Sequence, residues 1–352
     1  MRSRIGWILV IVAIVIAIVI AVMPAPYVID QPGPAYDTLG TVTISGETVP
    51  MIAILDEKSY PTDGQLELLT VRQVGTPDDL PTWSEVLVGW LSESRAVLPI
   101  DEAFPEGLSN ELLAEQGRIQ MEQSQQSAIA AALTELGYEV SASYSIATVL
   151  PDSPAKGLLH KGDLLSSVND QPITSVEFLR AQLAANGTDK PVRIGISRAG
   201  EELTVEVTPY EIEKGAVALG IEVASDFVFP ITVQIQLQDV GGPSAGLMFS
   251  LGIVDKLTEG PMTGGEAWAG TGTIAEDGTV GPIGGIRQKM FSAVRAGADW
   301  FLAPAANCDE VVGNIPSGLT VFAVGTLDEA RTAIDRVAKG AGTATLPTCE
   351  PE

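Results

Sequence analysis

An uninterrupted apolar run opens the chain and predicts a membrane-spanning helix. Residues 5–23 carry no charge and are mostly Ile and Val. At about 1.5 Å of helical rise per residue, such a run matches a hydrocarbon core of roughly 30 Å. Arg2 and Arg4 precede the run, and no Lys or Arg follows it before Lys58, so the positive-inside rule predicts a cytoplasmic N-terminus. The alternative is a cleaved signal peptide, but the run is longer than a usual signal core and "AVMPAP" is a poor cleavage site.

After this run the pattern changes to short β-type segments and then to a helix. Segments such as "LELLTVRQV" (66–74) alternate with turns rich in Pro and Gly. They predict a small mixed region over residues 31–120, which carries no chemical motif that we recognise. In "SQQSAIAAALTELGYEV" (124–140) apolar residues recur at helical spacing, which predicts a helix that ends at Gly137.

A third pattern, over residues 145–208, predicts a compact β-rich module. Two strands separated by a turn precede a helix whose apolar stripe contains Val176, Leu179 and Leu183. The following segment, "PVRIGISRAGEELTVEV", predicts a hairpin that turns at Ala199 and Gly200.

Composition narrows the classes of function. The 352 residues contain 20 Lys and Arg against 45 Asp and Glu, a formal net charge of −25. Such a chain repels nucleic acids and anionic lipid surfaces over most of its area, so we expect no nucleic-acid partner. No HExxH or Walker-type phosphate loop is present in these residues, and we expect no metal or cofactor.

A serine beside two glycines and a proline suggests a catalytic role. In "DVGGPSAGLMFSLGIVDKL" (239–257), Pro243 suits the first position of a buried helix, and Ser244 would follow in its first turn. Free backbone N–H groups converge there and can hold an oxyanion, with Gly242 and Ser244 as the expected donors. The alternative is a serine that only caps the helix.

The base for this serine is expected to be a lysine. The chain contains one histidine, His160, in a turn beside Lys161 that predicts exposure to solvent. In "GPIGGIRQKMFSAVRAGAD", Lys289 falls three residues after Ile286 and four before Ala293, on the apolar stripe of a predicted helix. To act as a base at neutral pH, the amine needs a pKa about 3 below the usual lysine value, and burial can supply this because it disfavours the charged form. The alternative is a lysine whose ammonium reaches the surface.

Two cysteines, Cys308 and Cys349, complete the candidates. In the predicted topology both lie outside the membrane, where a disulfide persists, and a bridge closing about 40 residues would stabilise the fold by about 4 kcal/mol. Two free thiols remain the alternative.

Several short motifs of the β-rich module resemble a PDZ domain. The resemblance implies that an extended peptide adds to a sheet edge beside the module's helix. In the loop that would bind a free carboxylate, Glu139 replaces the second glycine. The matching residues are "SPA" (153–155), Gly157, "KGD" (161–163) and the turn at 169–173.

The C-terminal third resembles the proteolytic domain of the Lon family. The motifs "GGPSAGLMFSLGIVDKL" and "AGTGTIAEDGTVGPIGGIRQKMFSAVRAGADWFLAPAANCDEV" carry this likeness over residues 215–340. It implies that Ser244 is the nucleophile of a Ser–Lys dyad, that Lys289 is its base, and that Thr271 places a hydroxyl beside the amine. The whole chain resembles membrane-anchored Lon-like proteases with a PDZ domain, and the family's ATP-driven motor is not carried over.

These inferences define one expectation. The fold class is α+β, with one N-terminal transmembrane helix, a β-rich PDZ-like domain and an α/β Lon-type proteolytic domain. The function is an ATP-independent serine endopeptidase, anchored in the cytoplasmic membrane with its catalytic domain outside. It would cleave peptides or unfolded proteins that the PDZ-like domain docks or gates.

A membrane-tethered peptide-binding scaffold is the alternative function. Whether the chain forms a homo-oligomeric ring stays open. The expected boundaries are 1–25 for the N-terminus and anchor, 26–120 for the mixed region, 121–212 for the PDZ-like domain, 213–345 for the proteolytic domain and 346–352 for the tail.

Overall fold

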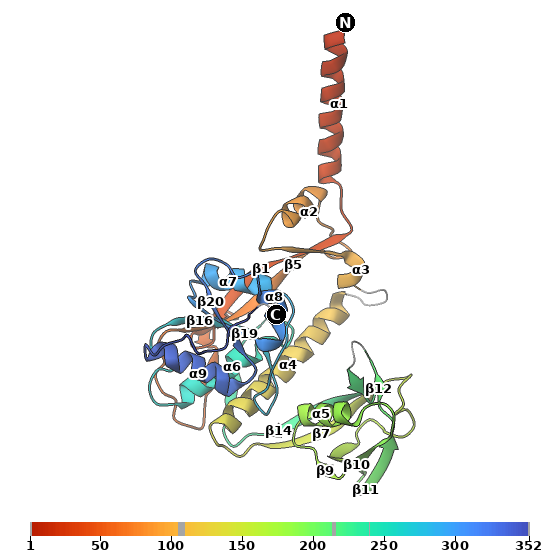
Figure 1. The fold of residues 1–352 in the computed structure, drawn as a ribbon, viewed down its shortest axis with the longest axis vertical. Helices are drawn as coiled ribbons and strands as arrows, with labels where there is room; N and C mark the ends of the chain where they lie inside the picture. The colour runs from red at the N-terminus through yellow and green to blue at the C-terminus, as the bar shows by residue number, and fades with distance from the viewer. Residues whose placement is uncertain (1, 105–109, 213–215, 239, 351–352) are drawn as a thin grey trace.

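The computed structural model of the chain describes residues 2–104, 110–212, 216–238 and 240–350. Figure 1 shows its arrangement. Helix α1 (Arg2–Val22) projects away from the rest, and a mixed α/β body lies in the centre. The long helix α4 (Asn110–Glu135) runs along one side of this body, and a β-rich unit spanning residues 141–228 lies on the other side of α4.

The predicted transmembrane anchor is wrong. In the four described ranges, no helix combines the length and the apolar character that a bilayer crossing requires. The physical criterion is strict, because a helix must offer about 20 consecutive, mostly apolar residues to match the hydrocarbon core. The predictions that depended on this anchor are corrected with it: the transmembrane part of the fold class, the membrane as a partner, and the location of the catalytic domain outside a cytoplasmic membrane.

A six-stranded mixed sheet organises the body. β1 pairs antiparallel with β5 and β6, whereas β5, β16, β19 and β20 run parallel to one another. The sheet therefore joins strands from before residue 100 to strands from after residue 266. Its strand order is β20 (Thr320–Val324), β19 (Trp300–Pro304), β16 (Ala267–Gly270), β5 (Gln65–Val74), β1 (Tyr27–Asp37) and β6 (Ala96–Pro99).

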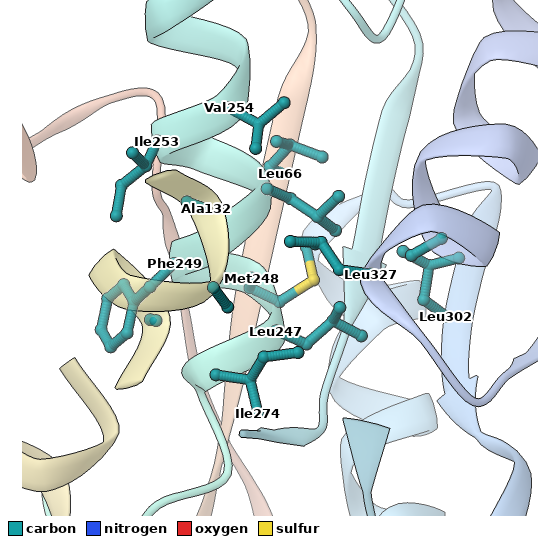
Figure 2. Close-up of a cluster of buried hydrophobic side chains, with 14 of the residues drawn as sticks. Leu66, Ala132, Leu247, Met248, Phe249, Ile253, Val254, Ile274, Leu302 and Leu327 are labelled. Carbon is teal, nitrogen blue, oxygen red and sulfur yellow. The ribbon is translucent and has the colours of Figure 1, made fainter. Parts of the chain in front are cut away.

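Helices cover both faces of this sheet. Leu68 on β5 and Trp268 on β16 belong to a core with α6 (Gly246–Leu257), α4 and α9 (Leu327–Ala338). Their neighbours Leu69 and Ala269 belong to the opposite core, with α7 (Ile286–Ala296) and α8 (Cys308–Val311). This alternation is the two-residue period of a strand that is buried on both faces. Figure 2 shows the first core, where Leu247 and Met248 of α6 lie among side chains from α4, β5 and α9.

The β-rich unit has a sheet and a core of its own. Leu179 and Leu183 of α5 (Val176–Asn186) are buried in this core, and Val176 is partly buried against it. The hairpin between β10 and β11 turns at Ala199 and Gly200, both at positive φ, which confirms the predicted turn. The strand order is β11 (Glu201–Val207), β10 (Val192–Arg198), β8 (Leu164–Val168), β7 (Ser141–Val149) and β14 (Ile221–Val228), with β9 (Gln171–Pro172) paired to β8.

Short elements connect these parts. The predicted helix end at Gly137 is confirmed, since α4 stops at Glu135 and Gly137 has a φ of 82°. A disulfide joins Cys308 to Cys349. The expected boundary at 212/213 adjoins residues 213–215, which lie outside the described residues. The remaining elements are the strand pairs β2 (Thr41–Ile44) with β3 (Glu47–Pro50), β4 (Ile52–Ile54) with β15 (Val233–Ile235), β12 (Tyr210–Glu211) with β13 (Val217–Ala218), and β17 (Thr273–Ile274) with β18 (Val280–Gly281), and the helices α2 (Trp83–Trp90), α3 (Ile100–Ala103) and η1 (Ala305–Asn307).

Candidate active site

The Lys289 amine lies within hydrogen-bonding distance of the Ser244 and Thr271 hydroxyl groups, the three side chains that the sequence predicted for the site. The Lys289 Nζ atom is 2.7 Å from Ser244 Oγ and 2.9 Å from Thr271 Oγ1. Ser244 lies just before α6, Thr271 just after β16, and Lys289 on α7. The site therefore forms where the ends of three elements meet at the edge of the body.

Helix α7 turns the lysine inward. Gly285 precedes the helix in the left-handed conformation, with a φ of 70°, and its carbonyl accepts the Lys289 N–H. Ile286, Met290 and Ala293 are fully buried on the same face, so their packing fixes the rotation of the helix. The lysine thus enters the core because its apolar neighbours on the helix do.

Burial changes the electrostatics of the amine. The Lys289 side chain is 3% exposed, and desolvation lowers its pKa from 10.5 to about 7. The two hydroxyl groups beside it are neutral, so no carboxylate at hydrogen-bonding distance compensates an ammonium charge in the contacts described. Near neutral pH the amine is therefore neutral in a substantial fraction of molecules and can accept a proton.

The structure places Ser244 differently from the expected first helical turn. Helix α6 begins at Gly246, two residues later. The reason lies in the Ser244 carbonyl, which accepts the Gly272 N–H at 2.9 Å and the Thr271 hydroxyl at 3.0 Å. These two bonds tie the serine to the segment between β16 and β17, and they leave its carbonyl outside the helical ladder.

Helix α4 holds the loop in front of Ser244, a feature that the sequence analysis did not predict. The Ser124 hydroxyl donates to the Pro243 carbonyl at 2.8 Å. About two helical turns earlier on α4, the Gly117 carbonyl accepts the Gly242 N–H at 2.9 Å. A side chain at Gly117 would lie 3.5 Å from the Gly241 Cα atom, so the two backbones are in close contact. The available sequence signal was a buried serine on the otherwise apolar face of α4.

The hydrogen bond from Gly242 to Gly117 occupies one of the two expected oxyanion donors. The Gly242 N–H already donates to Gly117, so a substrate oxyanion could use this donor only by displacing the Gly117 carbonyl. The Ser244 N–H lies at the turn that leads into α6, where the positive end of the helix dipole points toward the site.

Two cavities open onto the serine. One, of about 360 Å³, is lined by both Ser244 and Lys289 and by residues of β5. The other, of about 500 Å³, is lined by Ser244, Thr273 and Asn307. A polypeptide chain could therefore approach the hydroxyl from two sides.

Other candidate groups lie elsewhere. His160 is exposed in a turn of the β-rich unit, where its backbone N–H donates to Asp163 Oδ2. Among the residues described, no group of three or more His, Cys, Asp or Glu side chains is arranged to hold a metal ion.

Comparison with known proteins identifies both units. Residues 238–334 match the Lon protease (S16) C-terminal proteolytic domain, and residues 118–197 match the PDZ domain. The chain contains a Lon-type proteolytic domain and a PDZ domain. Ser244, Thr271 and Lys289 all fall in the Lon-type segment, whereas Gly117 lies outside both matches. The predicted membership is thus confirmed for these two domains.

Relatives of the Lon-type domain support a serine-type peptidase. Lon protease 1 of Sorangium cellulosum is 41% identical over 92 residues, which is 25% of this chain and 11% of that protein. Lon protease 2 of Herpetosiphon aurantiacus is 40% identical over 91 residues, 25% of this chain and 11% of that protein. The chain spans about a tenth of the length of these curated relatives.

Two solved PDZ domains are similar to part of this chain. The PDZ domain of the SdrC-like protein from Listeria innocua is 22% identical, covers 22% of this chain and 90% of that chain, and has a TM-score of 0.22. The corresponding domain from Listeria monocytogenes is 21% identical, covers 23% of this chain and 85% of that chain, also with a TM-score of 0.22.

Proposed function

We propose that the protein is a serine endopeptidase that hydrolyses peptide bonds with a dyad of Ser244 and Lys289 and without ATP. The observation that carries the proposal is the 2.7 Å contact between a buried amine with a pKa of about 7 and the hydroxyl of Ser244. A nucleophile within hydrogen-bond reach of a base whose pKa lies near neutrality is the arrangement that acyl transfer requires.

The catalytic steps follow from these positions. Neutral Lys289 takes the proton of Ser244 as Oγ bonds to the substrate carbonyl carbon, and the resulting ammonium then protonates the leaving amine. Water attacks the acyl-enzyme in the second half of the reaction, and the amine again accepts and returns the proton. The Thr271 hydroxyl, which contacts the amine and the Ser244 carbonyl, orients Lys289 toward the serine.

The tetrahedral intermediate needs donors for its oxyanion. We assign the Ser244 N–H to this role, together with the Gly242 N–H once the Gly117 carbonyl moves aside. Removal of one such donor typically costs about 3 kcal/mol of transition-state stabilisation.

The proteolytic unit, in this proposal, consists of the segments on both sides of the PDZ domain. The mixed sheet supports it, because β1, β5 and β6 complete a sheet whose other strands come from the Lon-type segment. The PDZ domain docks or gates extended substrate. Independence from ATP is supported by the absence of a Walker-type loop in the 352 residues.

Substitution of the dyad tests the proposal. We expect Ser244→Ala and Lys289→Ala each to lower hydrolysis of an unstructured peptide, without nucleotide, by at least about 1,000-fold. The matched controls are Ser250→Ala, a buried serine of α6, and Lys256→Ala, a half-buried lysine at the end of the same helix. Both controls should retain hydrolysis, and circular dichroism should show that all four variants are folded. Full turnover by folded Lys289→Ala would refute the dyad.

A serine-directed phosphonylating probe separates a peptidase from a peptide-binding scaffold. The wild-type protein should incorporate one probe at Ser244, detected by mass spectrometry of its peptides, and Ser244→Ala should incorporate none. A folded wild-type protein that stays unlabelled would favour the scaffold.

A further inference from the structure

A groove runs between the PDZ domain and the proteolytic body. Two cavities of about 870 and 980 Å³ lie along α4, the first against α5 and the start of β14, the second against the end of β14 and the β17–β18 hairpin. They form one continuous groove because they share lining residues from three elements. The shared residues are Ile119, Gln123, Val176, Glu177, Arg180 and Val223.

This groove continues to the nucleophile. The 980 Å³ cavity shares Pro243, Thr273 and Pro282 with the 500 Å³ cavity that Ser244 lines. A ligand that enters between α5 and α4 can therefore extend along β14 and reach the catalytic serine without leaving the groove.

The side of the groove formed by β14 is a sheet edge. β14 pairs with β7 along its whole length, from Ile221 opposite Val149 to Val228 opposite Ser141. The edge of β7 beside α5 is thus occupied by the chain itself. β14 ends the sheet, and among the described residues no strand pairs with its other side. An extended peptide can add to such an edge through backbone hydrogen bonds.

Contacts across the groove hold its walls together. The Val176 N–H, at the start of α5, donates to Glu276 Oε1 at 3.0 Å, and the Ser175 hydroxyl lies 3.5 Å from Asp277 Oδ2. Glu276 and Asp277 form the turn of the β17–β18 hairpin, whose first strand follows directly on Thr271 and Gly272. The PDZ helix is therefore tied to the hairpin that adjoins the catalytic site.

The lining residues define the chemistry of the occupant. Apolar side chains such as Ile119, Val223 and Phe227 line the two cavities together with acidic ones. Among the described lining residues the only cation is Arg180, which pairs with Glu177. The acidic lining residues are Glu122, Glu177, Glu222 and Glu276. Glu122 pairs with Arg118, which lines neither cavity, so Glu222 and Glu276 are the acidic lining residues without an ion pair in the described part of the chain. This excess of negative charge disfavours an acidic segment and favours a neutral or basic one.

We propose that the groove docks an extended, non-acidic segment of the substrate polypeptide as an added strand on β14, so that the adjoining segment reaches Ser244. The proposal rests on the proposed peptidase function. It specifies which part of the molecule selects the substrate and which chemistry it selects.

The experiment compares short and extended substrates with the full chain. One fluorogenic peptide covers only the residues around the cleaved bond. Others carry the same sequence with about 20 added residues on either side, enough to span tens of ångströms when extended. One set of added residues is basic and apolar, and the other is acidic. We expect the basic set, on the side that reaches the groove, to raise kcat/KM at least tenfold over the short peptide, and the acidic set to give no gain.

Two matched substitutions locate the effect. Ile119 is 41% exposed where the two cavities join, and Ile315 is 43% exposed and lines neither cavity. Ile119→Glu should reduce the ratio of extended to short kcat/KM to near one, and Ile315→Glu should keep the wild-type ratio. An unchanged ratio in folded Ile119→Glu, or no advantage of extended substrates in the wild type, would overturn the proposal.

Binding without turnover keeps the two proposals separable. Fluorescence anisotropy with Ser244→Ala should give a Kd for the labelled basic extension that Ile119→Glu raises at least tenfold and Ile315→Glu leaves unchanged. If the wild type hydrolyses no peptide but this difference holds, the peptidase function fails and the docking groove stands. If hydrolysis occurs but both variants bind alike, the groove fails and the peptidase stands.

Discussion

The proposed chemistry depends on the amine of Lys289. This amine is buried, and its described contacts include no counter-ion at hydrogen-bonding distance. Its pKa falls from 10.5 to about 7, so the folded state releases a proton that the unfolded state still binds between these two values. The free energy of unfolding contributed by this group is therefore lowest below pH 7 and rises as the pH increases toward 10.5. The protein gives up stability at this residue to keep a base.

The same pKa predicts the pH dependence of catalysis. Because the proposed base is the neutral amine, kcat/KM for a short peptide should rise with pH, bend near pH 7 and stay level to about pH 9. At pH 6 it should be about tenfold below the plateau. Initial rates between pH 5.5 and 9 check this expectation. A folded Lys289→Arg variant should show no such rise, because a guanidinium stays protonated throughout. A wild-type profile that keeps rising tenfold per unit to pH 9 would contradict a buried, neutral lysine.

At the scale of elements, helix α4 contributes to the site although it lies outside the Lon-type segment. Its Ser124 hydroxyl and its Gly117 carbonyl each bind the loop that precedes Ser244. The helix also packs against α6 through Ser250, whose hydroxyl donates to the Ala128 carbonyl. Helix α4 thus supports both the loop before Ser244 and helix α6 behind it.

Removing the Ser124 hydroxyl should impair positioning of the nucleophile. Ser124→Ala loses the bond to Pro243, and we expect kcat to fall about ten- to a hundredfold with little change in KM, because small displacements of a nucleophile cost this much. Ser124→Thr, which keeps a hydroxyl, should restore most of the rate.

Ser250→Ala is the matched control for this effect. It removes a buried hydroxyl of α6 that bonds the same helix α4, and both alanine variants should lose about 1 kcal/mol of stability. Only Ser124→Ala should slow catalysis. Steady-state kinetics gives the kcat of both variants, and urea denaturation gives their stability. An equal loss of kcat in Ser250→Ala would show that the effect of Ser124→Ala comes from lost stability alone.

At the scale of the whole molecule, local patterns were predictable and long-range assembly was not. The spacing of Ile286, Lys289 and Ala293 predicted a buried lysine because helical periodicity is a local property. The pairing of β5 with β16, about 200 residues later, has no local signal, since strand partners are chosen by packing of the complete sheet. The apolar run at 5–23 shows the limit of such patterns, because the expected anchor was wrong.

The disulfide acts on the whole fold by fixing the C-terminal segment to the body. Cys308 and Cys349 close a loop of 41 residues, and between them Leu346 is 8% exposed in the core of α6 and α9 while Ala323 donates to the Pro347 carbonyl. Opening a loop of this length costs up to about 4 kcal/mol in the chain-entropy account. We therefore expect the double variant Cys308→Ser and Cys349→Ser to unfold at lower urea concentration than the oxidised wild type. Its kcat/KM for a short peptide should be unchanged under native conditions, because neither cysteine touches the dyad.

Dithiothreitol should bring the wild-type urea midpoint down to that of the double variant and should leave the double variant unaffected. Coincident midpoints for oxidised wild type and double variant would show that packing of the segment around Leu346, rather than the covalent bond, holds it in place.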